Sequence, residues 1–142
     1  MSINAPFLVL VVDDEPPISE LLSLAAKKVF PEADFISTGS ARETMVYLND
    51  PTTTTPRLIL LDINLGQEAD GLALLPRLRS RFNGQVPIII FSGIDDEAKV
   101  KEAYSGGAVS FAVKPDAPQG WRDYVAVLRA YWYESTVLPP KQ

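Results

Sequence analysis

Five short apolar segments recur along the 142-residue chain, and a stretch with helical spacing of apolar residues follows each one. The segments are Phe7–Val12, Asp34–Ser37, Leu58–Leu61, Val86–Phe91 and Val109–Val113. Strands that alternate with crossover helices form a parallel sheet. The third segment and most of the fourth lack polar alternation, which is typical of strands covered by helices on both faces. The sequence therefore predicts one α/β domain with a doubly wound, five-stranded parallel sheet.

Five helices are predicted between and after these strands. Helical spacing indicates the first from about Pro17 to Val29, and Pro17 suits its opening turn. A capping-box pattern, Ser40 with Glu43, starts the second. Leucines at 72, 75 and 78 mark the third, and the fourth lies around 95–104 with a thin apolar face. The last carries the widest apolar stripe, which includes two tryptophans and two tyrosines.

The composition excludes several kinds of chemistry. The chain has no His and no Cys, so it holds no Ser-His-Asp triad, imidazole zinc site, thiol nucleophile or disulfide. Any metal ion must bind oxygen ligands, which favours Mg²⁺, Mn²⁺ or Ca²⁺. With 13 basic and 18 acidic residues the net charge is −5, which argues against direct nucleic-acid binding. The early apolar stretch Ala5–Val12 is too short for a membrane span, and a cytoplasmic protein is expected.

Polar side chains follow four of the five predicted strands. Asp13-Asp14-Glu15 follows the first, Asp62 the third, Ser92 the fourth and Lys114 the fifth. Strand order 2-1-3-4-5, common among doubly wound sheets, places these four strand ends next to one another. Clustered carboxylates repel one another unless a cation binds or a proton is taken up. The pattern therefore predicts a divalent metal site, and a cis Lys114–Pro115 bond is one way to aim the ammonium inward.

Each of these residues also has a simpler interpretation. A lone Asp after a strand is most often a helix cap or a turn residue. Lys114 taken alone is a surface lysine, and Ser92 a turn serine. Acids at two strand ends together with a lysine at a third favour the functional interpretation.

The ordered set of motifs resembles the receiver domains of two-component response regulators. The matching pieces are Val11–Glu15, Leu58–Asn64, Asp70-Gly71, Ile88–Gly93, Gly107-Ala108 and Phe111–Pro115. The resemblance covers about residues 6–132, so a receiver domain over 1–132 and a C-terminal tail over 133–142 are expected. It implies a flavodoxin-like fold and a phosphoacceptor that is not a turnover enzyme.

The resemblance also implies a role for each site residue. Asp62 would take a phosphoryl group from a phosphohistidine on a sensor histidine kinase, and Lys114 would pair with a phosphoryl oxygen. Asp13, Asp14, Asp62 and the backbone carbonyl of Asn64 would bind Mg²⁺. Ser92 would hydrogen-bond the phosphoryl group while Phe111 swings inward as a switch; a static core aromatic is the alternative for Phe111.

The end of the chain carries a weaker resemblance. Residues 131–139 resemble the C-terminal end of phytochrome-associated single-domain regulators, which implies a phytochrome-type kinase as partner, and no output domain is expected after about residue 132. An exposed aromatic face of the last helix predicts a homodimer. Its candidate residues are Trp121, Tyr124, Leu128, Tyr131 and Trp132. The alternative is that this helix packs wholly on its own sheet.

Two departures from the family pattern concern the surroundings of the site. Leu65-Gly66 stands where the family usually has Met-Pro, and residues 67–69 make a more polar loop. The apolar Ile94, two residues after Ser92, predicts slow autodephosphorylation. Two other classes were considered: a haloacid-dehalogenase-type phosphatase, in which the acidic pair comes last in the chain, and a receiver-like interaction module that is never phosphorylated.

Overall fold

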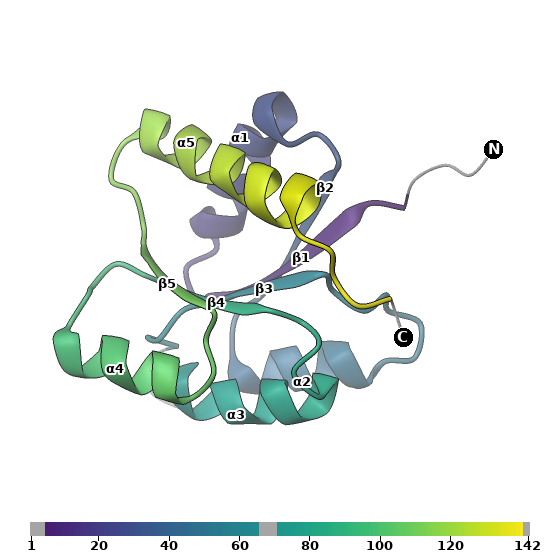
Figure 1. Cartoon of the computed structure of the whole chain (residues 1–142), viewed down its shortest axis with the longest axis vertical. Helices are drawn as coiled ribbons and strands as arrows, with labels where there is room; N and C mark the ends of the chain where they lie inside the picture. Colours follow the sequence, from purple (N-terminus) through teal and green to yellow (C-terminus); the bar gives the residue numbers. More distant parts are fainter. Residues whose placement is uncertain (1–4, 66–70, 141–142) are drawn as a thin grey trace.

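A computed structural model of the chain describes residues 5–65 and 71–140. Five parallel strands form one sheet in the order β2-β1-β3-β4-β5, with helices on both faces (Figure 1). This arrangement confirms the predicted α/β class and the predicted strand order. The strands are β1 Phe7–Val12, β2 Ala33–Thr38, β3 Leu58–Leu61, β4 Ile88–Ser92 and β5 Ser110–Val113.

Strand β4 begins two residues later than predicted and ends one residue later. Pro87 precedes it and has no amide hydrogen for a sheet ladder, so regular pairing starts only at Ile88. At the other end Ser92 pairs with Val113 of β5. The polar residue predicted to follow the strand is therefore its last member.

The helices are α1 Pro17–Val29, α2 Ala41–Asn49, α3 Gly71–Phe82, α4 Glu97–Ser105 and α5 Pro118–Leu128, followed by a π-helix, η1, over Arg129–Ser135. The predicted cap of α2 is present, since Ser40 Oγ accepts from the Glu43 amide at 3.0 Å. The Glu43 carboxylate accepts from the amide of Gly39, one residue before the cap, at 2.9 Å. Side chains thus satisfy two amide donors at the start of α2.

Two apolar cores lie on opposite faces of the sheet. All six residues of β1 are buried, and from Val9 to Val12 they alternate between the cores. Val9 and Val11 face the core under α1 and α5, while Leu10 and Val12 face the core under α2 and α3. This explains why the central strands read as unbroken apolar runs.

Helix α4 is held to the sheet by few contacts. Among its nine residues only Ala103 is buried. The Tyr104 hydroxyl accepts a hydrogen bond from the backbone amide of Phe111 in β5 at 3.1 Å. The structure therefore confirms the thin apolar face predicted for α4.

The end of the last helix differs from the prediction of a regular helix. At Arg129 the α-helix changes to a π-helix, whose wider turn brings both Trp132 and Tyr133 against the α1/α5 core. The Tyr133 ring lies 5.6 Å from that of Phe7 and 5.4 Å from that of Phe30. The boundary expected after Trp132 therefore falls inside η1.

Burial also revises the candidate dimer face. Trp121 is 7% exposed and Leu128 1% exposed, both against the protein's own sheet. These two side chains offer no surface to a second copy, because their helix turns this face toward the core. Tyr131, by contrast, is 56% exposed.

The structure bears on two further expectations. No helix within residues 5–65 and 71–140 is long and apolar enough to cross a membrane. The Lys114–Pro115 bond is trans, as are the other peptide bonds in the described part of the chain. The lysine side chain therefore reaches its position without the cis bond considered above.

Arg129 ties η1 to the loop before β2. Its guanidinium contacts both carboxylate oxygens of Glu32, at 2.9 and 2.8 Å, and lies 5.5 Å from the centre of the Tyr133 ring. The hydrogen bonds from Arg129 lower the pKa of Glu32 from 4.5 to about 2. Protonation of Glu32 thus weakens the attachment of the C-terminal segment.

Replacement of Glu32 by Gln should lower stability in a pH-dependent way. Because the pKa of Glu32 is depressed on folding, its stabilising effect is complete above about pH 5 and is lost as the pH falls from 4.5 toward 2. We expect the urea midpoints of the native and E32Q chains to differ by a constant amount near neutrality and to converge below about pH 4. E102Q, at an exposed position of α4, is the control. A difference that persists unchanged into acid would contradict the expectation.

Candidate functional site

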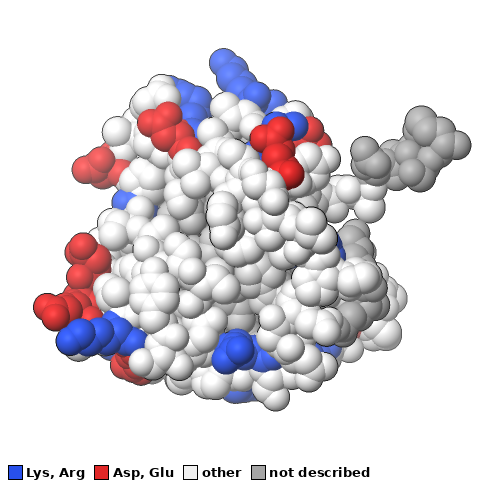
Figure 2. All heavy atoms as spheres, in the orientation of Figure 1, with Lys and Arg blue, Asp and Glu red and all other residues white. Residues whose placement is uncertain are grey.

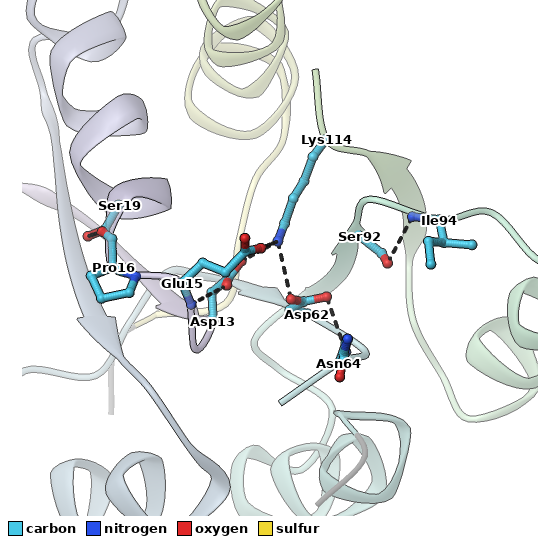
Figure 3. Close-up of polar contacts among 9 residues, drawn as sticks. All are labelled: Asp13, Glu15, Pro16, Ser19, Asp62, Asn64, Ser92, Ile94 and Lys114. Carbon is cyan, nitrogen blue, oxygen red and sulfur yellow. Dashed lines mark hydrogen bonds and ion pairs between the residues drawn. The ribbon is translucent and has the colours of Figure 1, made fainter. Parts of the chain in front are cut away.

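The sheet ladder brings the predicted site residues to one edge. The amide of Asp13 donates to Thr38 O at 3.0 Å, and the amide of Asp62 donates to Val12 O at 2.9 Å. The amide of Lys114 donates to the Ser92 carbonyl at 2.7 Å. Each residue therefore continues the hydrogen bonding of its strand by one step, and their side chains converge at the carboxyl ends of β1, β3, β4 and β5 (Figure 3).

Lys114 is the common partner of three carboxylates. Its Nζ lies 2.7 Å from Asp13 Oδ2, 3.2 Å from Asp62 Oδ2 and 3.1 Å from Glu15 Oε1. The Lys114 side chain is 9% exposed, so this is a buried ammonium rather than a surface lysine. Sequence reasoning gave Glu15 no role, although its position directly after Asp13-Asp14 was a usable signal.

Burial and charge shift the pKa values of this cluster. Burial raises the pKa of Asp13 and of Asp62, and the nearby Lys114 only partly offsets the effect. For Lys114, burial acts to lower the pKa, but ion pairs with Asp13, Asp62 and Glu15 outweigh it and raise the pKa. The lysine is therefore held as a cation, and the carboxylates lack full charge compensation.

The acidic residues fit a divalent metal ion. Carboxylate oxygens of Asp13, Asp14 and Asp62 all lie within 4.8 Å of one another. Opposite oxygen ligands of Mg²⁺ are about 4.2 Å apart, since each Mg–O bond is about 2.1 Å. Asp14 is exposed, whereas Asp13 and Asp62 are buried, so one side of the cluster is open to water. Mg²⁺ commonly keeps several water ligands, which such an opening allows.

Local turns fix the direction of each carboxylate. Asp13 Oδ1 accepts from the Glu15 amide at 2.9 Å, and Asp62 Oδ1 accepts from the Asn64 amide at 3.2 Å. Asp13 and Asp62 are thus turn residues, as the simpler interpretation expects, but this role occupies only one oxygen of each carboxylate. Each carboxylate uses one oxygen for its turn and points the other, Oδ2, at Lys114.

Ser92 ends β4, the strand next to β3, and Phe111 lies on β5, one strand further from Asp62. Ser92 is 5% exposed, and its hydroxyl accepts from the Ile94 amide at 3.3 Å. Ile94 itself is exposed. Phe111 is partly buried and packs against the α2/α3 core. The polar loop expected after Leu65 falls at residues 66–70, which lie outside the described residues.

Gly71 holds α3 close to the end of β3. Its amide donates to the Ile63 carbonyl at 2.6 Å. A Cβ at this position would overlap the backbone carbonyl of Asp62. The glycine is therefore required by the close approach of two backbones, one of which carries Asp62.

Comparison with known proteins identifies the family of this arrangement. Residues 9–126 match the family model of the response regulator receiver domain. The nitrogen assimilation regulatory protein NtrX of Azorhizobium caulinodans is 35% identical over 108 residues, which are 75% of this chain and 22% of NtrX. The chain spans between about a fifth and about half of the length of the curated relatives that it matches first.

Solved structures of similar fold include two response regulators, one of which is described as a phytochrome response regulator. The phosphorylated cyanobacterial protein RcpA superposes with a TM-score of 0.85 at 21% identity, over 96% of this chain and all of RcpA. The Mn²⁺-bound form of Rcp1 gives 0.82 at 22% identity, over 95% of this chain and all of Rcp1. At these identities the similarity establishes the fold.

Substitution of Gly71 by Ala should destabilise the chain by about 1–3 kcal/mol, because the added methyl must displace Asp62 or α3. G93A is the matched control, since a Cβ at Gly93 meets nothing within 4 Å. Urea unfolding of both variants measures the difference. Equal stabilities of G71A and G93A would show that the two backbones are not held together as the structure has them.

Proposed function

The chain belongs to the response regulator receiver family, whose members accept phosphoryl groups and are not turnover enzymes, and we propose that Asp62 is its phosphoacceptor. The observation that carries the proposal is the position of the Asp62 carboxylate. It lies 3.2 Å from the Lys114 ammonium and within 4.8 Å of two further acids at the same sheet edge. An anion that must meet an anionic phosphoryl group needs such neighbours.

The proposed reaction transfers a phosphoryl group from a phosphohistidine of a sensor histidine kinase. An Asp62 oxygen attacks phosphorus as the phosphorus–nitrogen bond breaks, and the electron pair returns to the partner's imidazole, which then takes up a proton. The product is an acyl phosphate on Asp62. The chain itself lacks His, so the donor imidazole belongs to the partner. Asp62 is fixed by its turn and its strand, so the chain contributes mainly positioning and charge neutralisation.

Asp13, Asp14 and Asp62 would hold Mg²⁺, together with the Asn64 carbonyl. When bound, this ion supplies neutralising charge to the phosphoryl oxygens and to the acids around it. The oxygen ligands of the cluster support this choice, as does the Mn²⁺ bound by the similar protein Rcp1. Lys114 would exchange part of its contact with Asp62 for a phosphoryl oxygen.

We further propose that Ser92 and Phe111 read the phosphorylated state. Ser92 would donate its hydroxyl hydrogen to a phosphoryl oxygen, which its place on the strand beside β3 supports. Phe111 would then move inward. Such a switch shifts a two-state equilibrium from 1:99 to 99:1 only if the two states differ by about 5.5 kcal/mol in their affinity for the phosphoryl group.

The proposed partners are a histidine kinase of the phytochrome type and a second copy of the chain. The similarity to RcpA and Rcp1 supports the first. Figure 2 shows a face between α5 and α4 whose centre carries no charged side chains, which supports the second. Val127 near the end of α5 and Tyr131 in η1 are both more than half exposed.

Incubation with acetyl phosphate and Mg²⁺ tests the phosphoacceptor. We expect intact mass spectrometry to show one added phosphoryl group on the native chain and none on D62N, because the amide of Asn lacks the nucleophilic carboxylate oxygen of Asp62. D34N, an exposed substitution in β2 with the same change of charge, should be phosphorylated as the native chain is. Phosphorylation of D62N would refute the assignment.

The same samples separate this function from its alternatives. An interaction module that is never phosphorylated would leave the native mass unchanged. A phosphatase would release phosphate continuously from a small phosphoester such as p-nitrophenyl phosphate, whereas the proposed acceptor should release none from it. A phosphoryl group that leaves the native chain within seconds would contradict the slow autodephosphorylation predicted from Ile94.

Elution volume tests the homodimer. The native chain should elute as a dimer after phosphorylation, and Y131S should remain a monomer of 15.6 kDa, since Tyr131 is exposed and its loss removes apolar contact area. V46S, an exposed apolar position on α2, is the control. Dimers of Y131S that match the native dimers would exclude this face.

A further inference from the structure

Helices α2 and α3 lie on the same face of the sheet (Figure 1). Residues of both helices line two hollows. The hollows measure about 430 and 770 Å³. Met45 of α2 and Arg77 of α3 line both, so the hollows form one continuous groove on either side of these residues. This α2/α3 groove lies on the far side of the sheet from α1 and α5.

The charged groups that line the groove are all positive. They are Arg42 of α2 and Arg77 and Arg81 of α3, and no carboxylate lines either hollow in the part of the chain that the structure describes. This sign is opposite to the net charge of −5 of the whole chain. The groove therefore attracts negative groups.

The three arginines are not equivalent. Arg81 donates to the side chain of Asn49 at 2.8 Å and to the carbonyl of Leu48. Its guanidinium is therefore engaged in hydrogen bonds at the C-terminal end of α2. Arg42 and Arg77 are exposed and make no ion pair with any described residue. Both line the smaller hollow, one from each helix. Two guanidinium groups are thus available to a ligand from opposite sides.

The lining of the groove also includes apolar side chains beside the arginines. Val46 is 65% exposed and lines the smaller hollow beside Met45 and Leu65. Pro76 and Phe82 line the larger one. A ligand that fits must therefore combine acidic groups with apolar side chains, and it must be large enough to reach both hollows.

We propose that the α2/α3 groove docks an acidic, amphipathic segment of a partner protein. Carboxylates of the segment pair with Arg42 and Arg77, and its apolar side chains fill the hollows on Met45 and Val46. A nucleic acid fits less well, because phosphate tracking needs a longer series of free cations than these two arginines. The inference is independent of phosphoryl transfer, since it uses no residue of the Asp62 site.

A displayed library of amphipathic 16-residue peptides, selected on the full chain, supplies the probe. Selection on the native chain, with counter-selection on R42A/R77A, should enrich peptides that carry Asp or Glu at helical spacing beside Leu, Met or Phe. A selected peptide should bind R42A/R77A about tenfold or more weakly in fluorescence polarisation, because each removed arginine deletes a charge-assisted hydrogen bond. V46S should weaken binding as well, and higher salt should reduce it.

K27A/K28A is the matched control, since it removes two exposed positive charges from α1 on the opposite face and should leave the affinity unchanged. Equal weakening by both double variants would show nonspecific charge attraction and overturn the proposal. So would enriched peptides without acids, or a selection that yields no peptide above background. A single-stranded oligonucleotide that binds through Arg42 and Arg77 more tightly than any selected peptide would assign the groove to nucleic acid instead. D62N should bind the peptide as the native chain does, which separates this test from that of the phosphoacceptor.

Discussion

The contact of one buried ammonium with several carboxylates governs the organisation of this molecule. Lys114 is inserted between Asp13 and Asp62, and neither acid could be buried so deeply without it, because unpaired buried charge is expensive. A single lysine nevertheless leaves negative charge uncompensated. The excess negative charge of the carboxylates favours binding of a cation, and the Lys114 ammonium favours an anionic oxygen beside it. Both preferences follow from electrostatics.

The strands supply the precision that this contact needs. Asp13, Asp62 and Lys114 each donate a backbone amide to the neighbouring strand, so the sheet ladder fixes their positions. Strands that are buried on both faces cannot slip by one residue without turning polar side chains inward. The two cores thus hold the site in register, and the turns after β1 and β3 orient its carboxylates.

Much of this arrangement could be predicted from the order of residues. The bounds of β1, β3 and α1 agree with the apolar runs and with Pro17, because burial on both faces and a proline at a helix start leave strong local signals. The convergence of the strand ends followed from the strand order. The π-helix could not be predicted, because Trp121, Leu128 and Trp132 are spaced as in an ordinary helix and the wider turn shows only in the packing of Tyr133. The burial of Trp121 and Leu128 was likewise ambiguous, since aromatic stripes serve cores and interfaces equally well.

The packing of Tyr133 on Phe7 and Phe30 joins the last helical turn to the first strand. During synthesis on the ribosome, the first strand emerges long before residue 133 does. Phe7 and Phe30 therefore remain without their aromatic cover until residue 133 has left the exit tunnel. Until then this apolar edge of the nascent chain is open to association with other chains, and the packing of Tyr133 closes it.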